Sequence, residues 1–224
     1  MDRDRGKPLI ASTLARVRKA IRHDPRNLLY PLVYPRCFSQ GILLFNGNRL
    51  IRHPTSRIVK TGGRLQFGCF WELWRGKGGI TLHENASLVL RGDVVLGDGV
   101  IIEVHRGARL EIGAGTFINP GARVLVLESV RIGSDCAVAW DVQIMDGDRH
   151  FFLDRTGQKE KNTAPVVIGD HVWIGARSLI LKGAVIGAGA VIGAGSVVAG
   201  EVPAAAVVAG NPARKVRDGV RWRK

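Results

Sequence analysis

A six-residue period in the C-terminal part of the chain constrains the fold more than any other feature. From residue 168 the sequence reads IGDHVW, IGARSL, ILKGAV, IGAGAV, IGAGSV and VAGEVP, with an aliphatic residue always first and a small or β-branched residue always fifth. Neither a helix, of period 3.6, nor an ordinary strand, of period 2, gives such hexads in register. Each hexad supplies one short strand and one turn, and three hexads close one triangular coil of a solenoid.

Looser copies of the same phrase predict that the solenoid begins well upstream. GRLQFG at 63–68, ASLVLRG at 86–92, ARLEIG at 108–113 and VRIG at 130–133 follow one another at coil-like intervals. We therefore expect an all-β fold of about seven stacked coils, with short parallel strands from residue 63 to 203. The period breaks at 151–166, which is polar and charged, and such an excursion predicts a projecting functional loop.

The net charge of +14 belongs mostly to the N-terminal segment, because residues 1–60 hold 13 Lys and Arg against 3 Asp and Glu. This uneven distribution argues against a nucleic-acid surface along the chain. One helical stripe is formed by Ile10, Leu14, Val17 and Ile21. We expect residues 1–60 to be helical in part and to cap the solenoid, which occupies 61–217 and is followed by a basic tail at 218–224. Contact of this helix with an anionic membrane is the alternative.

Targeting and redox features of the sequence favour the cytoplasm. No apolar run approaches the roughly 18 residues of a membrane span, and the first 25 residues lack the apolar core of a secretory signal. Three cysteines lie far apart without a CxxC pair, which argues against a disulfide framework or a zinc ribbon. We expect a cytoplasmic protein, at the inner face of the membrane if the N-terminal helix binds lipid.

The stretch from IGDHVW at 168 to GNPAR at 210–214 closely resembles the hexapeptide-repeat acyltransferases. Within them, residues 86–217 are similar to the maltose, galactoside and surface-polysaccharide O-acetyltransferases. The resemblance implies a left-handed parallel β-helix, a homotrimer, and transfer of an acetyl or other short acyl group from coenzyme A to a sugar or glycan hydroxyl. It implies no metal.

Acyl transfer from a thioester to a hydroxyl needs a base for the hydroxyl proton and donors for the oxyanion. His150 stands where the repeat breaks, and the resemblance makes it the general base; a surface histidine in an acidic turn is the alternative. Asp146 and Asp148 lie near it in sequence, and either could orient its imidazole. The resemblance also implies that the amide of Ala176 donates to the oxyanion.

The resemblance assigns further residues to the two substrates, and each assignment has a structural alternative. It assigns Asn119 and Glu128 to the acceptor, and we expect Trp140 and Asp141, which lie at a coil edge, to line the acceptor pocket as well. Those expected to bind coenzyme A are Trp173, Gly175, Ala176, Ala194, Arg214 and Lys215, the last two through its phosphates. Asn119 could instead be a corner residue of a tight turn, and the small residues could be plain hexad corners. Ala199 and Gly200 replace a Thr-Lys pair that is common in relatives.

Three other functions are alternatives to sugar O-acylation. A zinc carbonic anhydrase of this fold needs three converging histidines, and the corresponding run IGARSLILKGA contains none. An N-acyltransferase acting on an amino sugar would use the same geometry. A non-catalytic solenoid for binding or assembly would not require a histidine-bearing loop, an outward Trp173 or the C-terminal GNPARK motif.

Overall fold

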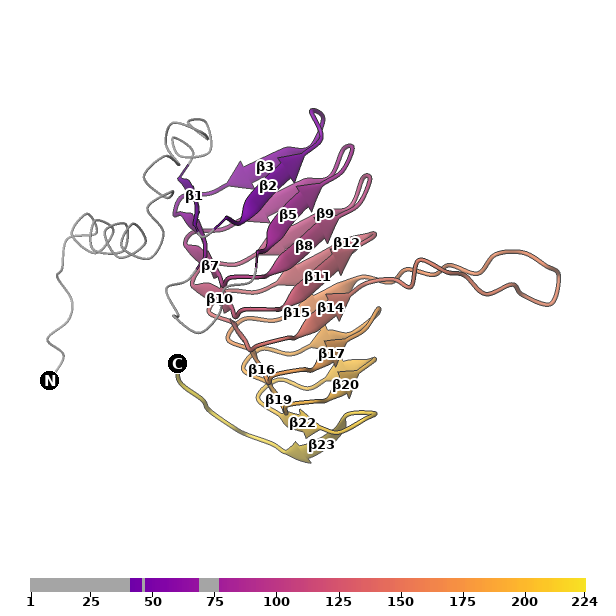
Figure 1. Ribbon diagram of the computed structural model, residues 1–224. Coiled ribbons are helices and arrows are strands. Elements are labelled where there is room, and N and C mark those ends of the chain that lie inside the picture. Colours follow the sequence, from indigo (N-terminus) through magenta and orange to yellow (C-terminus); the bar gives the residue numbers. More distant parts are fainter. Residues whose placement is uncertain (1–40, 46, 69–76) are drawn as a thin grey trace, which may run out of the picture.

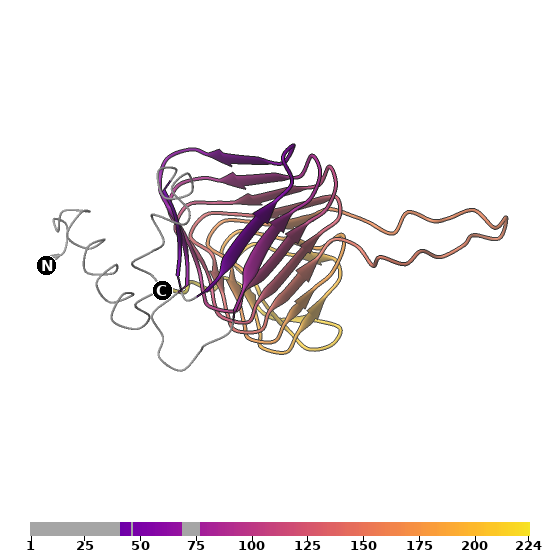
Figure 2. The same ribbon diagram turned by 45° about the horizontal axis from the view of Figure 1, so that its top comes forward.

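A computed structural model describes residues 41–45, 47–68 and 77–224. These residues form 23 strands in three sheets that wrap around a triangular prism (Figures 1 and 2). The expected N-terminal helix lies outside the described residues. Within the described part, no helix is long and apolar enough to cross a membrane.

Successive strands alternate among the three sheets, so that each coil contributes one strand to each face. Sheet A contains β1 (Ile42–Leu44), β4 (Leu65–Phe67), β7 (Val94–Leu96), β10 (Thr116–Ile118), β13 (Ala137–Val138), β16 (Trp173–Ile174), β19 (Val191–Ile192), β22 (Val207–Ala209) and β23 (Arg214–Arg217). Sheet B contains β2 (Arg49–Arg52), β5 (Gly79–Leu82), β8 (Ile101–Val104), β11 (Arg123–Val126), β14 (Gln143–Met145), β17 (Leu179–Ile180) and β20 (Val197–Val198). Sheet C contains β3 (Arg57–Lys60), β6 (Ser87–Leu90), β9 (Arg109–Ile112), β12 (Ser129–Ile132), β15 (Val166–Ile168), β18 (Val185–Ile186) and β21 (Glu201–Val202).

Three corners join the sheets, and most of the candidate residues lie at them. The AB corner, from sheet A to sheet B, includes residues 119–122, 139–142, 175–178 and 193–196. The BC corner includes 53–56, 83–86, 105–108, 127–128, 146–165 and 181–184. The CA corner includes 113–115, 133–136, 169–172, 187–190 and 203–206.

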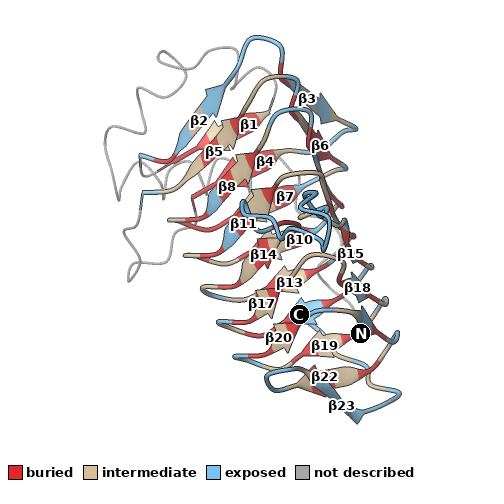
Figure 3. Ribbon diagram, turned by 90° about the vertical axis from the view of Figure 1, so that its right-hand side faces the viewer, coloured by how far each residue is buried: buried red, intermediate tan, exposed pale blue. Residues whose placement is uncertain are grey.

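The hexad repeat is confirmed as the source of the core. Its first positions, all buried, are Ile168, Ile174, Ile180, Ile186, Ile192 and Val198. They face one another from coil to coil, as in the pairs Ile174 with Ile192 and Ile180 with Val198. Figure 3 shows that buried positions recur along the strands of every coil. This regular interior holds the three corners in fixed register.

The solenoid is longer at both ends than the expected span of 63 to 203. A preceding coil contains β1, β2 and β3, whose Ile42 and Leu44 are buried although the hexad phrase is absent there. The inward apolar positions are present, but exposed arginines such as Arg49 and Arg52 conceal the pattern. At the other end, β22 continues sheet A and β23 pairs with it in antiparallel direction, which covers the edge of that sheet.

The projecting loop is confirmed, but it spans 146–165 and not 151–166, because it begins directly after β14 and because Val166 is already buried in β15. Residues 146–165, called the arm below, leave the BC corner as a long excursion (Figure 1). Its two sides are joined by antiparallel bridges between Gly147 and Thr163 and between Leu153 and Lys159. The arm is therefore a hairpin-like projection whose base is anchored in the prism.

Candidate active site

His150 lies at the base of the arm, where its backbone is held on both sides. Its N–H donates to the carbonyl of Asp148, and its carbonyl accepts a hydrogen bond of 3.0 Å from Asn162 Nδ2 on the returning side of the arm. The residue is exposed, and its imidazole has no hydrogen-bond partner among the described residues. The ring is thus placed by the backbone while both nitrogens remain accessible.

Asp146 is fully buried and holds the base of the arm to the coil below it. Its carboxylate accepts hydrogen bonds from the backbone N–H groups of Leu127, Glu128 and Ser129, at 2.6, 2.8 and 2.6 Å. Three such bonds give the carboxylate a structural role at the base of the arm. The other acidic neighbour, Asp148, forms an ion pair with Lys182. In this structure neither carboxylate contacts the ring, and orientation of His150 by either aspartate stays a prediction.

Glu128 lies against the arm at the same corner as His150. Its carboxylate accepts hydrogen bonds from Thr163 Oγ1 at 2.7 Å and from Lys161 Nζ at 3.0 Å. The hydrogen bond from Thr163, followed by that from Lys161, lowers the pKa of Glu128. An ionised carboxylate therefore stands beside the base of the arm.

Sequence reasoning missed a cluster next to His150 that comes from earlier coils. Arg149 Nη2 donates to Glu103 Oε2 at 3.1 Å and lies 2.9 Å from His105 Nε2. Glu103 Oε1 also lies 3.1 Å from His83 Nε2 and 3.2 Å from His105 Nε2. Burial opposes ionisation of Glu103, but the hydrogen bond from His83 and the nearby His105 and Arg149 charges outweigh it and lower its pKa. Burial is also the main cause that lowers the pKa of His105.

A faint signal for this cluster existed in the sequence. His53, His83 and His105 each follow a strand of sheet B, so successive coils place them one above another at the BC corner. They line a cavity of about 560 Å³ together with Arg52 and Arg106. Of the described residues, His83, Glu103 and His105 form the group that could hold a metal ion, with ligand atoms within 4.8 Å of one another. The carboxylate of Glu103 in this group already forms an ion pair with Arg149.

The AB corner collects most of the residues expected to bind substrates. Asn119 Nδ2 donates to the carbonyl of Val138 at 2.9 Å, as a corner residue that joins two coils would. Trp140 is 42% exposed, and Asp141 follows it with a left-handed φ of 57°. The N–H of Ala176 has no acceptor among the described residues, and neither has that of Ala194 on the next coil. A ligand carbonyl oxygen could accept from Ala176 at this corner.

Gly175 owes its identity to coil stacking. A Cβ at this position would lie 2.6 Å from the backbone nitrogen of Ala194 and 2.7 Å from the carbonyl oxygen of Ile192. Real Cβ atoms do not approach backbone so closely, so the next coil requires glycine here. Its position at a hexad corner is therefore enough to explain the glycine at 175, without a role in binding coenzyme A.

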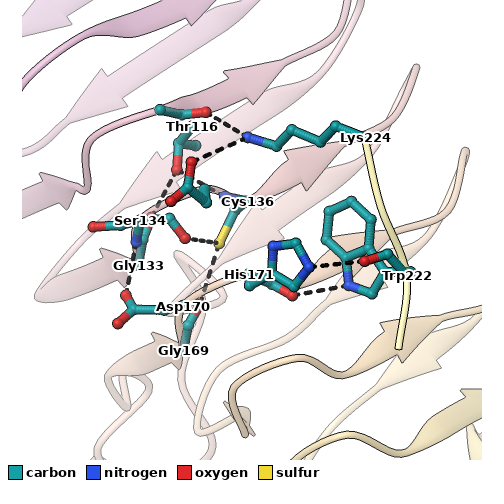
Figure 4. A network of polar contacts seen from close by, with 11 residues as sticks. Thr116, Gly133, Ser134, Cys136, Gly169, Asp170, His171, Trp222 and Lys224 are labelled. Carbon is teal, nitrogen blue, oxygen red and sulfur yellow. Dashed lines mark hydrogen bonds and ion pairs between the residues drawn. The ribbon is translucent and has the colours of Figure 1, made fainter. Parts of the chain in front are cut away.

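The outer face of sheet A carries the remaining candidates. Trp173 is 44% exposed, as its outward hexad position predicts. Arg214 and Lys215 are exposed on β23 at the end of the same sheet, where Lys215 Nζ lies 2.8 Å from Asp218. Figure 4 shows that the C-terminal residues return beside this face, with Trp222 packed against His171.

Comparison with known proteins identifies the family. A family model described as "Bacterial transferase hexapeptide (six repeats)" matches residues 165–200. The putative lipopolysaccharide biosynthesis O-acetyl transferase WbbJ of Escherichia coli (strain K12) is 32% identical over 164 residues, covering 68% of this chain and 77% of that protein. Nodulation protein L of Rhizobium meliloti (strain 1021) is 37% identical over 149 residues, covering 63% of this chain and 81% of that protein. The chain belongs to the hexapeptide-repeat acyltransferases.

Another relative and one solved structure extend this result. The polysialic acid O-acetyltransferase of Escherichia coli O1:K1 / APEC is 34% identical over 145 residues, and the chain spans only 44% of its length. The crystal structure of the polySia specific acetyltransferase NeuO has a TM-score of 0.53 at 26% identity, covering 80% of this chain and 85% of that one. The expected fold, a left-handed parallel β-helix, is thereby confirmed.

In this hexapeptide-repeat acyltransferase chain, the predicted residues divide between two corners. His150, Asp148 and Glu128 lie at the BC corner, whereas Asn119, Trp140, Asp141, Gly175, Ala176 and Ala194 lie at the AB corner. A strand of sheet B separates the corners, and five or six residues at about 3.3 Å each give a separation of roughly 16–20 Å. One chain therefore does not bring the candidate base to the candidate oxyanion donor.

Proposed function

We propose that this chain transfers an acetyl or similar short acyl group from acyl-coenzyme A to a hydroxyl of a sugar or glycan. The observation that carries the proposal is the base of the arm, where the backbone of His150 is fixed while its imidazole stays exposed. The names of the relatives, which are O-acetyltransferases of polysaccharides and galactosides, support this reaction and this class of acceptor.

The proposed reaction uses His150 as general base. A neutral imidazole nitrogen takes the proton of the acceptor hydroxyl as its oxygen attacks the thioester carbonyl. The N–H of Ala176 donates to the oxyanion that forms on that carbonyl. The carbon–sulfur bond then breaks, the imidazolium returns its proton to the thiolate, and the products are an ester and free coenzyme A. Asp148 is the candidate to stabilise the imidazolium.

We also propose that the site is completed by a second copy of the chain in a homotrimer. The separation of roughly 16–20 Å across sheet B prevents direct transfer within one chain. The arm projects far from its own prism and exposes Phe151, Phe152 and Leu153. In a cyclic trimer each copy offers its arm to the next copy, and the acceptor residues of both corners meet at the same cleft.

The first prediction concerns His150→Ala in an acetyl transfer assay with acetyl-coenzyme A and a panel of sugars, amino sugars and glycans. Loss of a general base typically costs about 10²–10⁴ in turnover, so kcat should fall at least a hundredfold. The affinity for coenzyme A and the molecular mass in solution should not change. His53→Ala is the matched control, because His53 lies at the same corner four coils away. A His150→Ala protein that keeps most of its turnover would refute the mechanism.

The acceptor panel also separates the O-acyl from the N-acyl reaction. An amine and a hydroxyl would use the same base, so both activities should disappear together in His150→Ala. If product forms only on amino sugars, the reaction of this chain is N-acylation and not O-acylation. A chain that binds a glycan but never turns over acetyl-coenzyme A would favour the non-catalytic solenoid instead.

A further inference from the structure

The basic C-terminal tail folds back onto the prism. From β23 it returns along the CA corner (Figure 1), where the N–H of Val220 donates to the carbonyl of Ala205 at 2.9 Å. Further along, Lys224 Nζ donates to the carbonyl of Gly115 at 2.6 Å. The contacts span several coils, so the tail has a defined course instead of ending in solvent.

Trp222 fixes the tail by three contacts with His171 (Figure 4). The two rings stack with centroids 4.2 Å apart and planes 8° from parallel. The indole Nε1–H donates to the carbonyl of His171 at 2.9 Å, and His171 Nε2 donates to the carbonyl of Trp222 at 3.0 Å. Reciprocal hydrogen bonds and a stacked pair at one residue hold the indole in a single orientation.

The tail and sheet A together form a groove of about 410 Å³. One wall comes from the outward residues of sheet A, and the other from the tail; the lining includes Phe117, Ala137, Trp173, Trp222, Arg223 and Lys224. The two indoles, Trp173 and Trp222, have centroids 6.0 Å apart and planes tilted by 46°. The walls are thus aromatic and apolar, with cationic side chains at the end that the tail supplies.

We propose that this groove binds the acyl-coenzyme A donor and that the tail, through Trp222 and Arg223, is part of the donor site. The proposal rests on the proposed function. Coenzyme A combines a flat adenine ring and a long pantetheine arm, which suit aromatic walls, with phosphates, which suit a guanidinium. A neutral sugar can also stack on an indole, but it lacks the phosphates that a guanidinium would bind. Arg223 has no ion-pair partner among the described residues, so its charge is available to a phosphate.

Direct binding of coenzyme A to the full-length chain, measured by calorimetry without turnover, tests the tail. Arg223→Gln removes the charge but leaves the Trp222 anchor, and a lost charge-assisted hydrogen bond should weaken binding about tenfold. The dependence of affinity on salt should also become shallower in this variant. Trp222→Ala should weaken binding at least as much. Arg221→Gln, in the same tail but outside the groove lining, should bind like the wild type.

The possible results distinguish a failure of the tail assignment from a failure of the proposed function. If the wild type binds coenzyme A and both variants bind it equally well, the tail assignment is wrong while the proposed function stands. Tighter binding in Trp222→Ala would also overturn the assignment, because the tail would then obstruct the groove. A wild-type chain that binds no coenzyme A would overturn the proposed function together with the tail assignment.

Discussion

Arg149 links the candidate base to two earlier coils. It directly precedes His150 and has a φ of 52°, a left-handed conformation that costs a non-glycine residue about 1 kcal/mol. Its guanidinium contacts Glu103 and His105, and Glu103 is held in turn by His83. We infer that Glu103 is a positioning residue, because its ion pair with Arg149 holds the backbone next to His150.

Glu103→Gln tests this role at the scale of one residue. The change removes the charge and keeps the shape, so Arg149 should lose its anchor and His150 its fixed position. We expect kcat to fall about tenfold with the donor KM unchanged. Stability should change by less than about 1 kcal/mol, because the pair is partly exposed. Glu103→Asp should restore part of kcat. Glu84→Gln, which breaks the nearby pair with Arg106, is the control. Equal loss of kcat in both Gln variants would contradict the positioning role.

At the scale of the element, the hexad determines which side chains face inward, and so the core could be predicted from the sequence. Ile174 and Ile192 meet because the coil length is constant between them. Contacts across irregular spacings could not be predicted in this way. Arg149 and Glu103 are 46 residues apart, and His171 and Trp222 are 51 residues apart, with the arm or the chain reversal after β22 between them. Which side chains meet at a corner depends on these irregular spacings, and the hexad repeat does not determine them.

The Gly175→Ala variant tests whether the stacking of coils explains why glycine occupies position 175. The added methyl group would meet the backbone of the next coil, which cannot move as a flexible side chain can. Overpacking of this kind costs about 1–3 kcal/mol in the free energy of unfolding, measured by urea denaturation. Gly79→Ala is the matched control, because its Cβ would have its nearest neighbour, Arg49 O, at an ordinary 3.7 Å. Unchanged stability with weakened coenzyme A binding would instead make Gly175 a donor-site residue.

At the scale of the whole molecule, the prism separates the functions that the reaction must combine. Sheet A and the AB corner carry Trp173, Ala176 and Arg214, whereas the BC corner carries His150 and the arm. A rigid solenoid cannot fold these surfaces onto each other, since every coil is packed between two neighbours. In the proposed homotrimer, apposition of two copies would bring the proposed base and the thioester within about 3 Å.

This division predicts complementation between two inactive chains. One variant, His150→Ala, lacks the base; the other combines Trp173→Ala with Arg223→Gln and lacks two side chains of the donor groove. Each homotrimer should be nearly inactive. In mixed trimers, an intact site needs its base from the second variant and its groove from the first. Random assembly of equal amounts of the two chains places this combination at about one quarter of the sites. Transferase activity after co-expression should therefore return to roughly a quarter of the wild-type kcat. If mixed trimers form, as shown by mass measurement, yet no activity returns, base and donor groove must belong to the same chain.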